Sequence, residues 1–198
     1  MTLTAAVEQD GIEIRPVEKA NWDAFEAYFS SIGRLNSCWC MAWRMTREEL
    51  KTNTGECRKA FIKQRVWDGI PIGLLAFADG QAIAWCSVAP RESHQRLYGD
   101  ETKDRVWSLT CFYISRAYRG KGLVHRLIRQ AKAYAKQNGA AYLEAYPVDP
   151  DSPSYRFMGF VKTFEQEGFE FIKDAGTRRH VMIFRLDGEN GKETAEMI

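Results

Sequence analysis

The stretch Arg119-Gly120-Lys121-Gly122-Leu123-Val124 lies between two segments with different hydrophobic patterns. The segment before it, 106–114, is rich in aromatic and β-branched residues and therefore predicts a strand. The segment after it predicts an amphipathic helix, because apolar residues recur every four positions from Leu123 to Ala135. The junction between a strand and a helix is thus the best-defined feature of the chain.

Two glycines at this junction allow a tight turn and let a ligand approach the backbone closely. A helix leaves the amides of its first turn without intrahelical acceptors, and its dipole adds positive potential there. With Arg119 and Lys121 beside them, these amides predict a phosphate site; the alternative interpretation is a simple tight turn. The stretch lacks the Gly-Lys-Ser/Thr of a P-loop and the third glycine of a dinucleotide fingerprint.

The charge distribution points to the same region. The chain has 28 Lys and Arg against 26 Asp and Glu, a net charge of +2. The segment 105–143 contains no Asp or Glu and is +8, which leaves −6 (20 − 26) for the rest. A local positive field favours an anionic ligand, although a solvated helix face explains most such runs. Nucleic acid is a weaker candidate, because the overall balance is not strongly basic.

Composition limits the class of protein. The 198 residues are 45% hydrophobic and 27% charged, which is typical of one globular domain and excludes a disordered or collagenous chain. No apolar run approaches the roughly 20 residues that span a bilayer. Glu8 and Asp10 are unlike the basic start of a secretory signal, so we expect a cytoplasmic location and reduced thiols for the five cysteines. We divide the chain into an extension (1–10), one domain (11–186) and a polar tail (187–198).

The remaining patterns predict an α+β fold whose strands are mostly joined by hairpins, with one right-handed β-α-β unit over 106–148. Asp79-Gly80 is a strong hairpin signal, because both turn positions need positive φ. Thr46 and Glu49 form a capping pattern before a charged helix that 52–55 can interrupt. The predicted strands are 12–17, 72–78, 81–88, 141–148, 169–172 and 181–186, and the predicted helices are 21–31, 46–66 and 157–167.

These residues resemble the GCN5-related N-acetyltransferase superfamily over about 12–186. The family motif, Gln/Arg-x-x-Gly-x-Gly/Ala, appears here as Arg119 to Val124, with Val at the last position. The closing Phe164-x-x-x-Gly168-Phe169 is similar as well. Three further stretches resemble a bacterial subgroup of uncharacterised acetyltransferases: Trp85-Cys86-Ser87-Val88-Ala89-Pro90-Arg91, Cys111-Phe112 and Leu143-Glu144-Ala145-Tyr146-Pro147.

The resemblance implies a mixed, mostly antiparallel sheet flanked by helices, in which two central parallel strands splay to form an acyl-CoA cleft. It implies that the diphosphate rests on the backbone of 119–124 and that the pantetheine arm lies between strands 107–114 and 143–148. It also implies that an amine directly attacks the thioester of acetyl-CoA in a ternary complex. The implied cofactor residues are Cys111, Phe112, Tyr113, Ile114, Arg119, Gly120, Lys121, Gly122, Leu123 and Val124.

The catalytic candidates follow from the same resemblance. Glu144 is the expected general base, and the alternative is a strand carboxylate bonded to its neighbours; Glu101 and Asp104 are reserve bases. Family members often carry a general-acid tyrosine where this chain has Phe164. Tyr155 is the expected substitute, Tyr146 is another, and either can instead be a wall residue. These are the two catalytic residues we predict: Glu144 and Tyr155.

The cysteines and tryptophans have plainer alternatives. Cys111 is better explained as a small buried strand residue than as a nucleophile, since no His is placed to activate it. Cys38 and Cys40 are half of a metal site without its second pair, so we expect no metal. Trp39 and Trp43 either line the acceptor pocket or pack in the core.

The predicted function is N-acetyl transfer to a small-molecule or peptide amine by a monomer or homodimer, without a nucleic-acid or membrane partner. Two rivals stay open. One is a non-catalytic acyl-CoA-binding module, which Phe164 and Val124 favour. The other is a nucleic-acid binder that uses the +8 segment.

Overall fold

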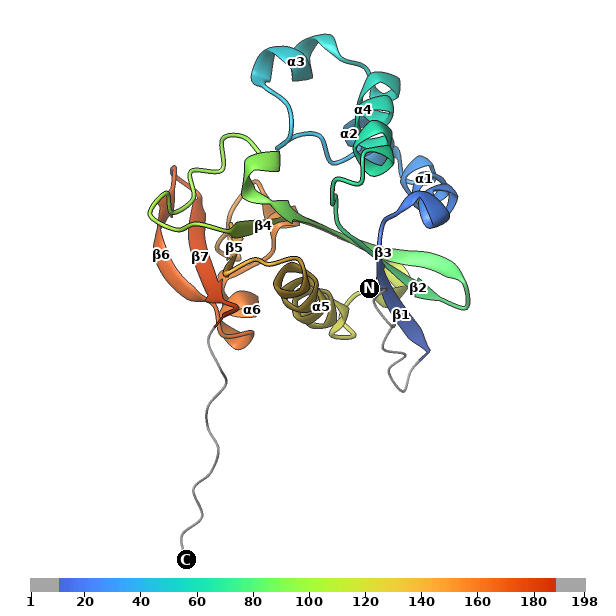
Figure 1. Cartoon of the computed structure of the whole chain (residues 1–198). Coiled ribbons are helices and arrows are strands. Elements are labelled where there is room, and N and C mark those ends of the chain that lie inside the picture. The colour runs from blue at the N-terminus through green and yellow to red at the C-terminus, as the bar shows by residue number, and fades with distance from the viewer. Residues whose placement is uncertain (1–10, 188–198) are drawn as a thin grey trace, which may run out of the picture.

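A seven-stranded sheet forms the centre of the molecule in the computed structural model, which describes residues 11–187 (Figure 1). The strand order is β1-β2-β3-β4-β5-β7-β6. Neighbouring strands are antiparallel except β4 and β5, which are parallel. This mixed sheet confirms the predicted fold class. The strands are β1 Ile12–Pro16, β2 Leu74–Ala78, β3 Gln81–Pro90, β4 Val106–Ile114, β5 Tyr142–Ala145, β6 Glu170–Ala175 and β7 Arg179–Arg185.

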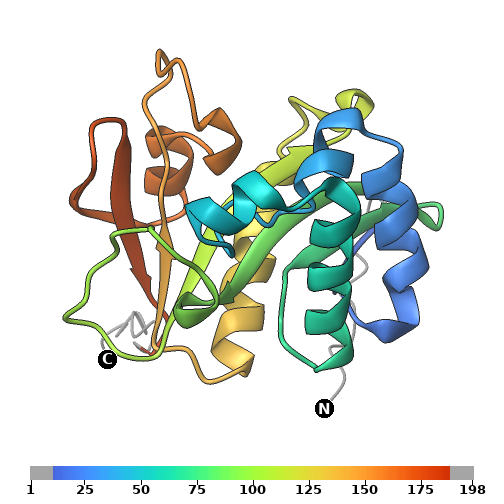
Figure 2. The ribbon, with the colours of Figure 1, turned by 90° about the horizontal axis from the view of Figure 1, so that it is seen from above.

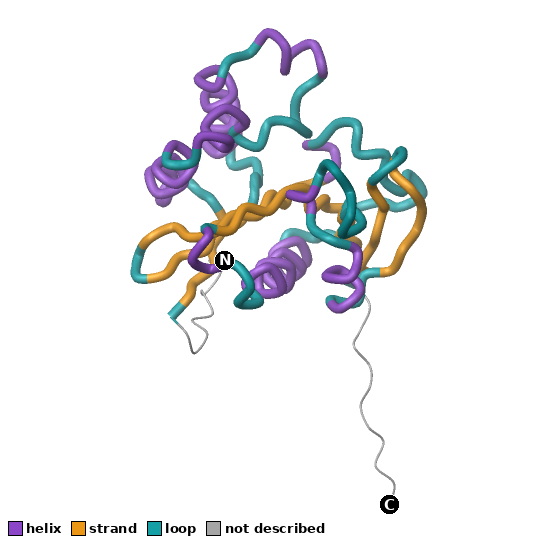
Figure 3. The backbone as a smooth tube through the Cα atoms, turned by 180° about the vertical axis from the view of Figure 1, so that it is seen from behind, coloured by secondary structure: helices purple, strands orange, loops and turns teal. Residues whose placement is uncertain are grey.

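Helices cover both faces of the sheet. Figures 1 and 3 show α5 on one face and the group α1 to α4 on the other, and Figure 2 shows that group gathered over the half of the sheet nearer β1. Short 3-10 turns join several elements. The helices and turns are α1 Trp22–Ser30, α2 Gly33–Cys38, α3 Arg47–Thr52, α4 Gly55–Trp67, α5 Leu123–Gln137, α6 Val161–Gln166, η1 Lys19–Asn21, η2 Arg91–Ser93, η3 Arg116–Tyr118 and η4 Arg156–Met158.

Each face of the sheet has its own core. On one face the stripe of α5, including Leu127 and Ala131, is fully buried against the strands. On the other, aromatic side chains dominate: Phe29 stacks on Trp39 at 5.5 Å between ring centroids, and both are fully buried. Burying such side chains stabilises the fold by about 1.5–3 kcal/mol each. Trp39 is therefore a core residue rather than part of an open acceptor pocket.

Local signals set most element boundaries as predicted. Asp79 (φ 48°) and Gly80 (φ 73°) form the hairpin turn between β2 and β3. Thr46 Oγ1 accepts a hydrogen bond from Glu49 N (3.1 Å), and Glu49 Oε2 accepts one from Thr46 N (2.7 Å), which completes a capping box on α3. The predicted helix over 46–66 is two helices, α3 and α4, because the chain leaves helical geometry at Asn53.

Other boundaries differ from the prediction. The strand predicted to reach 148 ends at Ala145, and Val148 makes only isolated bridges beyond Pro147. The helix predicted over 157–167 is divided into η4 and α6 by Gly159, whose φ of 88° is outside the helical region. The extension 1–10 and the tail from 188 lie outside the described residues. Among the helices within 11–187, none is both long and apolar enough to cross a membrane.

Candidate active site

The parallel strands β4 and β5 separate in the middle of the sheet. Their pairing runs from Val106 opposite Tyr142 to Leu109 opposite Ala145 and stops there. β4 continues to Ile114, held on its other edge by β3. After Leu109, one edge of β4 is therefore not covered by β5 and faces a gap between the two strands. An extended ligand can hydrogen-bond to such an edge like an added strand.

The chain after β5 forms the other side of this gap. Pro147 O accepts a hydrogen bond from His180 N (2.9 Å), which draws the chain toward β7. The amide of Val148 donates a hydrogen bond to Gly159 O (3.0 Å). The preceding turn, η4, packs against β4. The segment that begins with η4 is therefore a wall of the gap, and Gly159 lets it approach closely: a Cβ there would lie 2.9 Å from the Phe164 ring.

The glycine-rich junction follows β4 after the short turn η3. Gly120 (φ 73°) and Gly122 (φ 75°) are both left-handed, and a Cβ on either would meet nothing within 4 Å. Conformation rather than space therefore demands glycine here, because other residues pay about 1–2 kcal/mol in this region. Gly122 is the N-cap of α5 and has no capping side chain, so the amides of Leu123 and Val124 are left for a ligand.

Two basic side chains flank these amides. Arg119 Nε donates to Ile114 O (2.8 Å), and its guanidinium lies 5.7 Å from the Tyr113 ring, which ties the junction to the end of β4. Lys121 Nζ lies 5.6 Å from the Tyr118 ring. Val124 is half-buried and packs on the core of α5, so its side chain is engaged with the protein rather than placed over its own amide.

One carboxylate, Glu167, pairs with part of the cationic face of α5. Glu167, at the end of α6, accepts two hydrogen bonds from Arg129 (3.0 and 3.1 Å), and a third bond joins its Oε1 to His125 Nδ1 (2.9 Å). Lys132 bonds to the Glu167 carbonyl. Burial acts to raise the pKa of Glu167, but these partners outweigh it and the pKa is lowered. Part of the +8 segment thus holds α6 against α5.

The structure places Glu144 in a closed network. Its side chain is fully buried; Oε1 accepts from Asp100 N (2.7 Å) and Oε2 from Tyr146 OH (2.7 Å), while Arg91 Nη1 lies 3.4 Å from Oε1. A Cβ on Gly99 would come within 2.3 Å of Oε2. The carboxylate therefore anchors the loop before β4. This geometry favours the alternative of a bonded strand carboxylate, and the base role of Glu144 stays a prediction.

The reserve bases lie farther from the gap. Glu101 and Asp104 are exposed in the loop that precedes β4. Strand residues rise about 3.3 Å each, so Asp104 is roughly 20 Å along the chain from the uncovered part of β4. The structure does not bring these two carboxylates to the site.

The two tyrosine candidates differ in access. Tyr146 is fully buried, and its hydroxyl also lies 3.0 Å from Ser108 Oγ. Burial, followed by the charge of Glu144, raises the pKa of Tyr146. Tyr155 is 37% exposed, has a φ of 60°, and lies at the start of η4 with its ring 5.9 Å from Trp43. Tyr155 is open to solvent, whereas Tyr146 belongs to the Glu144 network.

The cysteines near the gap serve packing. Cys40 Sγ accepts from Trp85 Nε1 (2.9 Å). A hydrogen bond also joins the thiols of Cys40 and Cys111. This bond lowers the pKa of Cys40, although burial acts to raise it. The same bond raises the pKa of Cys111, and burial raises it further. A thiol with a raised pKa is a poor nucleophile. Within residues 11–187, no group of three or more His, Cys, Asp or Glu is arranged to hold a metal ion.

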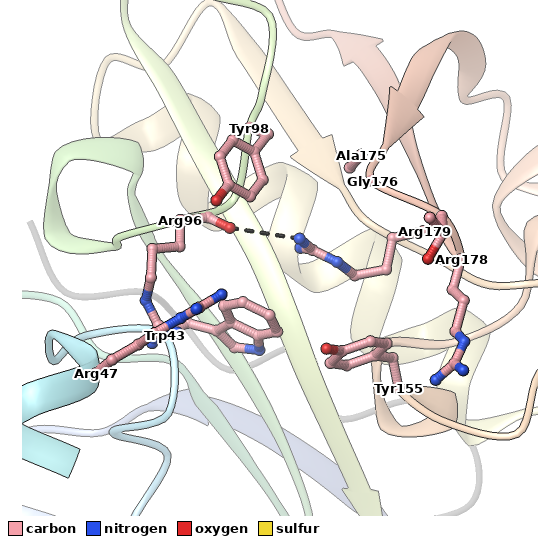
Figure 4. A pocket seen from close by; sticks show the side chains of 10 residues that line it. Trp43, Arg47, Arg96, Tyr98, Tyr155, Ala175, Gly176, Arg178 and Arg179 are labelled. Atoms are coloured by element: carbon pink, nitrogen blue, oxygen red, sulfur yellow. Dashed lines mark hydrogen bonds between the residues drawn. The ribbon is translucent and has the colours of Figure 1, made fainter. Parts of the chain in front are cut away.

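A cavity of about 290 Å³ adjoins Tyr155 (Figure 4). Sequence reasoning found only two of its lining residues, Trp43 and Tyr155. It missed the arginines, because they lie outside the +8 segment and come together only through the fold. Their positions are Arg47, Arg96, Arg178 and Arg179.

Comparison with known proteins gives a consistent picture. The model of the acetyltransferase (GNAT) family matches residues 35–160. The fold is similar to that of yncA from Salmonella typhimurium, solved with its cofactor acetyl-CoA (18% identity, TM-score 0.55, covering 93% of this chain and 99% of that one). It is also similar to PaiA N-acetyltransferase from Thermoplasma acidophilum in complex with coenzyme A (17%, 0.53, 88% and 98%).

A third similar structure is ribosomal-protein-alanine N-acetyltransferase from Brucella melitensis (20% identity, TM-score 0.53, covering 87% of this chain and 99% of that one). At these identities the likeness concerns the fold. No curated protein matches the chain in sequence.

Proposed function

Because the chain belongs to the acetyltransferase (GNAT) family, we propose that it is an acyl-CoA-dependent N-acyltransferase that moves acetyl from acetyl-CoA to a primary amine. One observation carries the proposal: the uncovered half of β4 leads, through the short turn η3, into the glycine-rich N-terminus of α5. A hydrogen-bonding edge and an anion site are therefore joined in sequence and in space, as a ligand with an extended arm and a diphosphate requires.

The cofactor would lie along these two features. Its diphosphate would accept hydrogen bonds from the Leu123 and Val124 amides, with Arg119 and Lys121 adding charge. Its pantetheine arm would pair with the β4 backbone over 112–114. The thioester would then reach the part of β4 around Cys111 and Phe112, where a backbone amide can stabilise the oxyanion.

The chemistry needs one proton to move. The neutral amine attacks the thioester carbonyl carbon, a C–N bond forms, and the C–S bond then breaks. The amine nitrogen loses one proton and the departing thiolate gains one, so the step balances without another reactant. Tyr155 is the proposed donor to the thiolate. Glu144 is fully enclosed, so any part it has in accepting the amine proton would pass through Tyr146.

A titration tests the proposal against its rivals. Calorimetry with acetyl-CoA should show saturable binding, and an amine panel should release free CoA, detected with a thiol reagent. Binding without transfer to any amine would favour the non-catalytic module. This outcome is worth testing because Phe164 stands where family members often have a tyrosine. Salt-sensitive binding of oligonucleotides without CoA binding would favour the nucleic-acid alternative.

A further inference from the structure

The cavity beside Tyr155 is built from four separate parts of the chain. Trp43 and Arg47 come from the segment around the start of α3, Arg96 and Tyr98 from the loop before β4, and the rest from η4 and the β6–β7 hairpin. Figure 4 shows the side chains of Arg47, Trp43 and Tyr155 lying around one hollow. Its ten lining residues are Trp43, Arg47, Arg96, Tyr98, Tyr155, Ala175, Gly176, Thr177, Arg178 and Arg179.

The charged side chains that line the cavity are all positive. It contains four arginines and no Asp or Glu, a formal charge of +4. None of the four makes an ion pair with any residue within 11–187. Elsewhere the protein does pair its basic side chains, as Glu167 does for Arg129 and Lys132. A cluster of uncompensated arginines around a cavity attracts an anion.

Arg179 is the residue whose environment most needs a partner. It is only 6% exposed, and burial lowers its pKa, since its charge is poorly solvated. Its Nη2 donates one long hydrogen bond to Arg96 O (3.4 Å), drawn in Figure 4, whereas its Nη1 is buried with no hydrogen-bond partner. The guanidinium lies 4.5 Å from the Trp43 ring. A buried charged donor left unsatisfied is costly, and a bound anion would satisfy it.

Arg96 and Arg178 are positioned by hydrogen bonds to uncharged groups, which keep part of each guanidinium available. Arg96 Nη2 donates to Ala42 O (2.7 Å) and Met45 O (3.1 Å), and Arg178 Nη1 donates to Ser154 Oγ (2.9 Å). Arg47 is exposed at the first position of α3. These contacts fix the fork of Arg96 without neutralising it. Preorganised forks of this kind suit carboxylate and phosphate groups.

The cavity adjoins the gap where transfer would occur. Tyr155 lines the cavity and immediately precedes η4, which packs against β4. Arg179 lies opposite Val148, three residues beyond the end of the β4–β5 pairing. A molecule that fills the cavity therefore lies beside Tyr155 and next to the element that packs against β4.

We propose that this cavity binds a carboxylate or phosphate group of the acceptor, so that the acceptor is a small amine that also carries an anion. The inference rests on the proposed N-acyl transfer and names its substrate class. Polyamines and lysine-rich segments are disfavoured, because a second positive charge would meet four guanidinium groups. The volume is near the lower end of small-ligand pockets, which favours a compact acceptor.

Matched acceptors test the proposal. The wild-type protein is assayed with pairs that differ in the anion: tyrosine against tyramine, and O-phosphoethanolamine against ethanolamine, with spermidine as a cationic reference. We expect kcat/KM to favour the anionic member by about tenfold or more, the effect of one charge-assisted hydrogen bond or two. The first pair reports on carboxylate and the second on phosphate. Equal or better use of tyramine, ethanolamine and spermidine would overturn the proposal.

Variants locate the effect. Arg47→Gln and Arg178→Gln alter exposed side chains and should raise the KM for the anionic acceptor about tenfold, with the KM for acetyl-CoA unchanged. The matched control is Arg185→Gln, an exposed arginine of the same hairpin that lies outside the cavity and pairs with Asp187. Arg179→Gln should have the largest effect. If the anionic preference survives both exposed-site variants, the cavity does not bind the anion.

Failure of the two proposals can be told apart. Absence of acetyl-CoA binding, or of transfer to every amine, would contradict the proposed function. Transfer without an anionic preference would contradict only the acceptor assignment. Calorimetry of O-phosphoethanolamine and of tyrosine with the CoA-saturated protein reports on the cavity even without turnover. Binding of either compound that weakens in Arg178→Gln supports the assignment, and binding of neither refutes it.

Discussion

Gly122→Glu tests whether the N-terminus of α5 holds the cofactor. Gly122 has a φ of 75° and Gly139, at the other end of the same helix, has 82°; a Cβ on either would meet nothing within 4 Å. The same substitution at Gly139 is therefore a control with equal strain, about 1–2 kcal/mol in each case. A carboxylate near the start of a helix is stabilising by about 0.3–1 kcal/mol and near its end is unfavourable. Gly122→Glu should thus be the more stable of the two variants.

Cofactor binding should show the opposite order. In Gly122→Glu a negative side chain stands where the diphosphate would meet the Leu123 and Val124 amides. Losing two hydrogen bonds to a charged group costs about 3 kcal/mol or more, roughly a hundredfold or more in the Kd for acetyl-CoA. Gly139→Glu should leave the Kd unchanged. Calorimetry gives the Kd, and thermal unfolding verifies that both proteins are folded. A Kd for Gly122→Glu within about threefold of the wild type would refute the phosphate site.

Three further outcomes are expected. Tyr155→Phe should lower kcat by about tenfold to a hundredfold and leave acetyl-CoA binding intact, because a general acid acts on the chemical step; an unchanged kcat would assign the tyrosine to the pocket wall. Glu144→Gln should lower the free energy of unfolding by about 1–3 kcal/mol, because hydrogen bonds to a charged carboxylate are lost. The pH–rate profile should stay unchanged; a shift of its acidic limb would instead support Glu144 as the general base. Burial acts to lower the pKa of His180, but hydrogen bonds to Asp149 (3.0 Å) and Asp174 (2.9 Å) outweigh it, and the pKa is raised. This stabilisation is complete below the ordinary pKa of about 6.5 and is lost as pH rises through the folded value. Because both aspartates are exposed, the wild type should lose only about 0.5–1 kcal/mol between about pH 5.5 and 8.5 in denaturant titrations, and His180→Asn should lose none; an equal loss in both would contradict this.

The fold was largely predictable because its signals are local. The turn at Asp79-Gly80 needs positive φ at both positions, and Gly122 needs it before α5. The capping box at Thr46 and the apolar period of α5 act within one or two helical turns. Such preferences act between neighbours in sequence, so they can be recognised before any tertiary contact is known.

Prediction was weaker where a segment's conformation depends on distant neighbours. The strand after Tyr142 was predicted to reach 148, but the chain beyond Ala145 is drawn away by contacts with β7 and with Gly159. The segment 33–38, which forms α2, carries no pattern that we recognised. Packing against α1 and α4 surrounds this short helix, and short helices depend mostly on such packing.

The same distinction applies to the site. Order along the chain was enough to locate the junction of β4 and α5, because strand, short turn, glycines and helix follow one another there. The enclosure of Glu144 by Tyr146 and the Asp100 amide, and the gathering of arginines around one cavity, depend on which strands pair and in which register. Those contacts join residues as far apart as Trp43 and Arg179, 136 positions (179 − 43). Their charge and access follow from burial, which no local pattern of residues specifies.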